Sequence, residues 1–140
     1  MVILLEEAKG IADELRRLLV LKGRRPEDFI VAVSQNPIVG RTEQEARGKY
    51  MELLQLIPHN SLPRPLFFGS AEKVADQVQD WYETGAMDML ILRQDHPHGL
   101  QDFIELVVPI LQQRGVFRTE YESDTLRGNL ELPRPAFRKI

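Results

Sequence analysis

Three short apolar runs, separated by segments of helical periodicity, constrain the fold of this 140-residue chain more than any other feature. The runs are FIVAVS (29–34), LFFGS (66–70) and MDMLILR (87–93). Short runs this apolar are typical of strands that a parallel sheet covers on both faces. Because a helical segment follows each run, the order predicts an α/β fold whose parallel strands are joined by right-handed crossovers.

Four amphipathic segments are the predicted helices, at residues 4–22, 42–57, 71–84 and 100–113. Thr42 and Glu45 have the Thr-x-x-Glu spacing of a capping box, which marks the start of the second helix. Ser70 is the expected cap of the third helix. Pro109 lies inside the fourth and should kink or shorten it, because proline lacks the amide hydrogen that a helix interior uses.

The first predicted helix carries its apolar side chains three and four positions apart, which is the spacing of one buried face. These side chains are Leu5, Ala8, Ile11, Ala12, Leu15, Leu18 and Leu19. We expect the whole face to be buried and Gly23 to end the helix.

A sheet of only three apolar parallel strands has two unpaired edges and two faces to cover. A closed (β/α)8 barrel needs about 250 residues, so one domain over residues 1–140 has room for a part of one. The sequence therefore predicts three parallel βα units of a partial TIM barrel, followed by an extended tail at 115–140. We also expect the chain to be a homo-oligomer, with sheet edges paired between copies.

Composition excludes several classes of protein. The formal net charge of −3 argues against a nucleic-acid partner bound through a broad basic surface. No apolar run approaches the ~20 residues of a membrane span, so no membrane partner is expected. The chain has no cysteine, which excludes disulfides, thiolate metal ligands and a cysteine nucleophile, and favours the cytoplasm.

Three segments carry a resemblance to a known family. They are PIVGRTEQEA (37–46), FGSAEKVADQVQDWYETGAMDMLIL (68–92) and DFIELVVPILQQRGVFRTEYESDTLRGNLELPRP (102–135). Together they resemble the C-terminal part of the bacterial-luciferase-like flavin-dependent monooxygenases. Within that family they are most similar to the branch of nitrilotriacetate monooxygenase component A, and the tail is the most specific signature.

The resemblance implies a TIM-barrel enzyme that takes reduced FMN from a separate flavin reductase and oxidises a small organic substrate with O2. It covers only the last part of the family's barrel. The Gln-Ala-Gly-x-Ser segment that binds the flavin phosphate in the family does not occur in this sequence, so no flavin contact carries over. The alternative is a non-catalytic binding or oligomerisation module derived from the same part of the barrel.

Gly69 and Ser70 are candidates for cofactor binding, because a strand ends and a helix begins there. Free amide hydrogens and the helix dipole favour an anion such as a phosphate at this point. The simpler interpretation is an ordinary helix cap, and the family resemblance places the FMN phosphate elsewhere.

The loop RQDHPHG after the last predicted strand offers Arg93, Asp95, His96 and His98. Barrel enzymes hold their active sites on this face, which makes these residues the candidates for catalysis. They could contact substrate or flavin, or form a solvated loop. A metal is not expected, because a third firm ligand is missing and the family uses none.

Asp88 and the aromatic pair Trp81 and Tyr82 are expected to have structural roles. Asp88 lies near the start of a predicted strand, where we expect it to pair with a neighbouring backbone group or a basic side chain. Of Trp81 and Tyr82, at least one should belong to the core, given their helical spacing with Val74 and Val78.

The tail is predicted to be a C-terminal extension that lies over the barrel or across a subunit contact. Its anchors would be Val116, Phe117, Tyr121, Leu126, Leu130 and Leu132.

Overall fold

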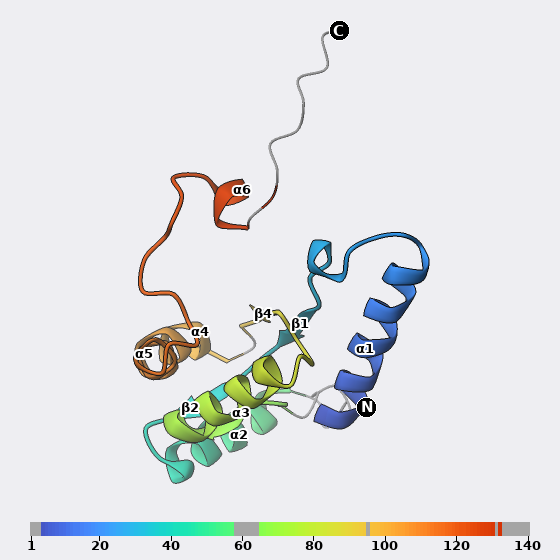
Figure 1. The fold of residues 1–140 in the computed structure, drawn as a ribbon. Helices are drawn as coiled ribbons and strands as arrows, with labels where there is room; N and C mark the ends of the chain where they lie inside the picture. The colour runs from blue at the N-terminus through green and yellow to red at the C-terminus, as the bar shows by residue number, and fades with distance from the viewer. Residues whose placement is uncertain (1–3, 58–64, 95, 131, 133–140) are drawn as a thin grey trace, which may run out of the picture.

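The computed structural model describes residues 4–57, 65–94, 96–130 and 132, and Figure 1 shows their arrangement. Its strands are β1 (Ala32–Gln35), β2 (Ile38–Gly40), β3 (Phe68–Ser70) and β4 (Met89–Leu92). Its longer helices are α1 (Leu5–Leu21), α2 (Glu43–Leu56) and α3 (Ala71–Glu83). A 3-10 turn (Pro26–Asp28), α4 (Gly99–Asp102), a π-helical segment (Phe103–Val107), α5 (Val108–Gln113) and α6 (Leu126–Asn129) complete the order.

The described strands form two parallel pairs. β1 pairs with β4, with Ala32 opposite Met89, and β2 pairs with β3, with Ile38 opposite Phe68. The parallel α/β prediction is confirmed, but the predicted number of strands is wrong, because β2 lies in a segment that the sequence predicts to be a connection. All three residues of β2 are buried, yet a run this short between a proline and a glycine has no readable period.

The core lies between the strands and the helices α3 and α5 with the π-helical segment. Phe67, Val74 and Val107 have no exposed surface. Trp81 meets Phe67 edge to face at 5.7 Å between ring centroids. Trp81 is 6% exposed and Tyr82 51% exposed, which confirms that at least one of this pair belongs to the core.

Helix α1 buries only half of its apolar face. Ala12 is fully buried, and Leu5 and Ala8 pack against the core. Ile11, Leu15 and Leu18 remain 54%, 37% and 41% exposed. The prediction of one fully buried face is therefore wrong on the side of these three residues, although Gly23 ends the helix as expected, with φ +70°.

The helix that contains Pro109 is neither cut short nor stopped. Helical backbone runs from Gly99 to Gln113 and contains the π-helical turn immediately before the proline. There the amide of Val108 donates to the carbonyl of Phe103, five residues back. The wider turn absorbs the irregularity that the ring of Pro109 introduces one residue later.

The described tail stands away from the rest of the chain (Figure 1). Val116 packs against the core, whereas Tyr121 and Leu126 are 77% and 76% exposed. A tail laid over its own part of the barrel is therefore not what the structure shows beyond Phe117. The alternative, a tail across a subunit contact, stays a prediction. Among the described helices, none has both the length and the apolar character needed to cross a bilayer.

Candidate functional site

The carboxyl ends of the strands gather polar residues at one edge of the fold. β2 and β3 end side by side, with Gly40 opposite Ser70. At the end of β4, the amide of Arg93 donates to the carbonyl of Gln35 at 2.8 Å, so this strand ends beside β1. Helices α2, α3 and α4 begin just beyond these ends. In α/β folds with parallel strands, ligands bind at this edge.

Lys49 ties three elements together at this edge. Its Nζ lies 2.9 Å from the carbonyl oxygen of Val39, 3.0 Å from Oδ2 of Asp102 and 2.9 Å from Oε1 of Glu45. Burial disfavours the charged ammonium, but hydrogen bonds to the two carboxylates outweigh it, so the pKa of Lys49 is raised. Lys49 therefore fixes the last residue of α4 against β2, and the amide of Asp102, which donates to the carbonyl of His98, extends this attachment to the loop after β4.

The sequence prediction did not include Lys49. The four-residue spacing of Glu45 and Lys49 on one helix was a readable signal. The contact with Asp102 joins positions 53 residues apart, and no local pattern indicates it.

The N-terminus of α3 already holds a carboxylate of this chain. The hydroxyl of Ser70 accepts from the amide of Lys73 at 3.4 Å, which confirms the predicted cap. Oε1 of Glu43 lies 3.0 Å from Nζ of Lys73. The hydrogen bond from Lys73, its charge and the amide of Ser70 lower the pKa of Glu43 against the opposing effect of burial.

Gly69 allows Glu43 to come this close. Its φ is +137°, and a Cβ at this position would lie 2.6 Å from Oε1 of Glu43. Gly69 and Ser70 thus form a small anion site in which Glu43 is the anion. Whether a phosphate replaces that carboxylate stays a prediction.

The loop after β4 is closed by its own backbone. The amide of Gly99 donates to the carbonyl of His96 at 3.0 Å, and the amide of Asp102 donates to His98 at 2.8 Å. His98 has φ +66°, the one positive φ of a non-glycine residue in the described chain. A left-handed conformation at such a residue costs roughly 1–2 kcal/mol, so surrounding contacts must hold it.

The structure places three of the four candidates for catalysis on this loop. His96 is half-buried, while Arg93 and His98 are exposed. Asp95 lies outside the described residues. No group of three histidine, cysteine, aspartate or glutamate side chains that could hold a metal is found in the part of the chain that the structure describes.

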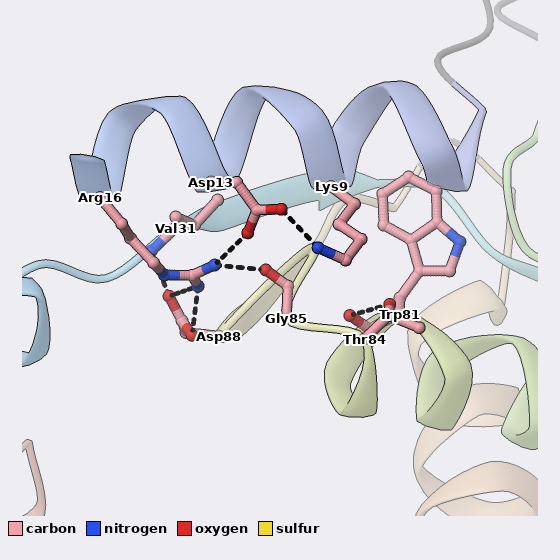
Figure 2. A network of polar contacts seen from close by, with 8 residues as sticks. All are labelled: Lys9, Asp13, Arg16, Val31, Trp81, Thr84, Gly85 and Asp88. Atoms are coloured by element: carbon pink, nitrogen blue, oxygen red, sulfur yellow. Dashed lines mark hydrogen bonds and ion pairs between the residues drawn. The ribbon is translucent and has the colours of Figure 1, made fainter. Parts of the chain in front are cut away.

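A second polar cluster lies at the opposite edge, where β1 and β4 begin (Figure 2). Oδ2 of Asp88 accepts from the amide of Val31 at 2.8 Å, and both its oxygens accept from Arg16, at 3.0 and 3.1 Å. Arg16 also donates to the carbonyl of Gly85 at 2.6 Å. The predicted structural role of Asp88 is confirmed, because this carboxylate joins α1 to the residues immediately before β1 and β4.

Comparison with solved structures defines the class of the fold. The structure is similar to that of a riboflavin lyase, with a TM-score of 0.79 at 21% identity, over 91% of this chain and 40% of that one. It is also similar to long-chain alkane monooxygenase, with a TM-score of 0.69 at 26% identity, over 91% of this chain and 38% of that one. The chain is thus an α/β unit that matches about 40% of a luciferase-like TIM barrel.

Sequence comparison then gives the family. No family model matches the chain. It is 35% identical over 132 residues to nitrilotriacetate monooxygenase component A of Aminobacter aminovorans, which covers 94% of this chain and 24% of that protein. The chain belongs to the luciferase-like flavin monooxygenases and spans about a quarter of this relative's length. The resemblance seen in the sequence is confirmed.

Proposed function

We propose that this chain provides the last βα units of a two-component monooxygenase that works in the cytoplasm. Such an enzyme oxidises a small organic substrate with O2 and reduced FMN, which a separate flavin reductase supplies. The 35% identity to nitrilotriacetate monooxygenase component A, over 94% of the chain, carries the proposal. Reduced flavin supplies the oxygen chemistry when bound, and the protein binds and orients it.

The loop after β4 is the part of this chain that we assign to the active site. Arg93, Asp95, His96 and His98 follow the carboxyl end of a parallel strand, where barrel enzymes bind their ligands. Imidazole and guanidinium groups can donate hydrogen bonds to a substrate carboxylate or to flavin oxygens. Lys49 positions this loop through Asp102.

The donor set at Gly69 and Ser70 suits an anion, but a phosphate would have to displace Glu43. The carboxylate of Glu43 already accepts from the amide of Ser70 and pairs with the ammonium of Lys73. Replacement of Glu43 by glutamine removes the competing charge and leaves the donors in place. If Gly69 and Ser70 contact the FMN phosphate, Glu43→Gln should therefore bind FMN more tightly than the natural chain. Unchanged FMN binding would argue against this site.

Titration of the purified chain with FMN, followed by flavin fluorescence, tests the proposal. We expect binding of FMN in the high micromolar range and weaker binding after His96→Ala with His98→Ala. Riboflavin, which lacks the phosphate, reports separately on the ring contacts. Glu14→Gln is the matched control for Glu43→Gln, because Glu14 is a helical glutamate paired with a basic residue elsewhere. If high micromolar FMN causes no change, the chain has the ancestry of an enzyme without its flavin site.

A non-catalytic oligomerisation module is the second candidate function. The observation that favours it is the amount of large apolar surface left exposed on α1 and on the tail. A chain that ignores FMN and self-associates would support this alternative.

A further inference from the structure

The loop after β4 is fixed at both of its ends. At the first end, the amide of Arg93 donates to the carbonyl of Gln35 at 2.8 Å, just after the β1–β4 pair. At the second end, Asp102 is the last residue of α4, and Lys49 holds its carboxylate. A short segment between two fixed points has few backbone conformations open to it, so the path of this loop is set by its attachments.

The attachment at the second end is largely shielded from water. Nζ of Lys49 lies 3.0 Å from Oδ2 of Asp102, and the two side chains are 18% and 21% exposed. The same ammonium donates to the carbonyl of Val39, a strand residue, at 2.9 Å. Hydrogen bonds between charged groups are stronger in such surroundings than on an open surface. Lys49 therefore connects a strand to the helix that follows the loop.

His98 serves the loop with its backbone. Its φ and ψ are +66° and 1°, and its carbonyl accepts from the amide of Asp102 at 2.8 Å to form the first turn of α4. Histidine is one of the few residue types other than glycine that are enriched in this left-handed region. Its side chain is exposed. The turn alone thus accounts for a histidine at this position.

His96 is placed differently. Its carbonyl accepts from the amide of Gly99 at 3.0 Å, and its Cβ lies 3.7 Å from the place that a Cβ on Gly99 would take. The residue is half-buried, and its imidazole has no hydrogen-bond partner in the part of the chain that the structure describes. Polar groups that are shielded from water usually have such a partner. A bound ligand would supply one.

We propose that His96 is the histidine of this loop that contacts a bound ligand. Lys49 is then a positioning residue, which acts on His96 through Asp102 and the turn at His98. The assignment rests on the proposed function, because it requires a ligand at the carboxyl edge of the strands. That ligand is an organic molecule with an oxygen that accepts a hydrogen bond from an imidazole, and FMN is the probe.

Titration with FMN, followed by flavin fluorescence, separates the two histidines. We expect His96→Ala to weaken FMN binding about fivefold more than His98→Asn, which is the size expected for one lost hydrogen bond. Asparagine suits position 98 because it also adopts the left-handed conformation. Equal effects of the two variants would overturn the assignment to His96. A natural chain that does not bind FMN would refute the proposed function and, with it, the ligand contact of His96.

A double variant tests whether Lys49 acts through His96. We expect Lys49→Met to weaken FMN binding about fivefold in the natural chain, but less than about twofold in a chain that already carries His96→Ala. Lys9→Met is the matched control, because Lys9 also pairs with a carboxylate, that of Asp13 on the same helix. The control should change FMN binding in neither background. An effect of Lys49→Met that is equally large with and without His96 would overturn the positioning role.

Amide hydrogen exchange tests the attachment without flavin. The amide of Gly99 donates within the turn, and the amide of Met89 donates to the carbonyl of Val31 at the opposite edge. We expect Lys49→Met, and Asp102→Asn as a milder variant, to speed exchange at Gly99 about tenfold more than at Met89. Circular dichroism checks that both variants are folded. Equal acceleration at the two amides would mean that Lys49 stabilises the fold as a whole, and would refute a specific role in the loop.

Discussion

Replacement of Asp88 by alanine should destabilise the fold far more than the loss of an ordinary surface carboxylate. Asp88 receives one backbone amide and a two-pronged hydrogen bond from Arg16 (Figure 2). Removal leaves the amide of Val31 without its acceptor. It also leaves Arg16, whose side chain is only 23% exposed, with the more distant carboxylate of Asp13, at 4.0 Å on the same helix, as its remaining ion pair. The attachment of α1 to the start of the β1–β4 pair then depends on its small apolar contact and on the bond from Arg16 to Gly85.

The size of the effect follows from burial. A hydrogen bond to a charged group contributes about 1.5–3 kcal/mol, whereas an exposed ion pair contributes about 0.2–1 kcal/mol. Because the side chain of Asp88 is 37% exposed, water screens the pair, and we take about 2 kcal/mol for Asp88→Ala. Asp88→Asn keeps an oxygen for Val31 but loses the charge, so about 1 kcal/mol is expected.

Urea unfolding followed by circular dichroism measures both values, and an unchanged slope with denaturant shows that they compare the same two states. Asp28→Ala is the control, because the Asp28–Arg25 pair is local and its side chains are 47% and 76% exposed. Asp28→Ala should leave the urea concentration at the midpoint of unfolding unchanged within experimental error. If Asp88→Ala and Asp28→Ala unfold at the same urea concentration, Asp88 does not attach α1 to the strands, and the reasoning is wrong.

Lys49→Met should cost about 1–3 kcal/mol in urea unfolding, because two carboxylates then face each other without a cation. Since hydrogen bonds from Lys49 and from the amide of Arg41 lower the pKa of Glu45, this group stabilises the fold above its unfolded pKa near 4.5, and that contribution is lost as pH falls through the folded pKa. Melting temperatures below pH 5 should therefore fall less steeply in Lys49→Met than in the natural chain, and parallel curves would contradict this. Gly40→Ala should reduce soluble yield and cost at least ~2 kcal/mol, because its Cβ would lie 2.5 Å from a backbone nitrogen of α2. Gly48→Ala, with nothing within 4 Å, should instead stabilise the helix by about 0.5–1 kcal/mol in the same assay.

Local patterns predicted the helices well, because their signals are short-range. The hydroxyl of Thr42 accepts from the amide of Glu45 at 3.1 Å, as the capping box requires. The return bond differs, since Glu45 accepts from the amide of Arg41 at 2.9 Å rather than from Thr42. Thr-x-x-Glu spacing thus located the start of α2, but the path of the chain into the helix decided which amide the carboxylate reached.

Burial of α1 was overestimated for a different reason. Helical period shows which side of a helix is apolar, but not whether the fold has enough other elements to cover it. Leu5 and Ala12 meet the core, while Ile11 and Leu18 remain 54% and 41% exposed in the part of the chain that the structure describes. Lys49 shows the same limit for the site, since its partner Asp102 is 53 residues away.

The open sheet and α1 are the two surfaces through which copies of the chain could associate. The exposed apolar side chains on each surface indicate which one contributes more. The exposed residues of β1 and β4 are Ala32, Ser34 and Ile91, of which Ile91 alone is large, at 46% exposed. Water can satisfy the open backbone groups of the edges, and each hydrogen bond gained there contributes only about 1 kcal/mol net. The outward side of α1, with Leu4 just before it, offers four large aliphatic side chains: Leu4, Ile11, Leu15 and Leu18 are 63%, 54%, 37% and 41% exposed. The free energy of association grows with the apolar area removed from water. Ile91→Thr, which keeps a β-branched side chain, should therefore leave self-association of the purified chain in light scattering unchanged, while Leu15→Ser/Leu18→Ser should weaken it. Self-association that Ile91→Thr abolishes would instead place the contact between copies at the sheet, as the strand pattern alone predicted.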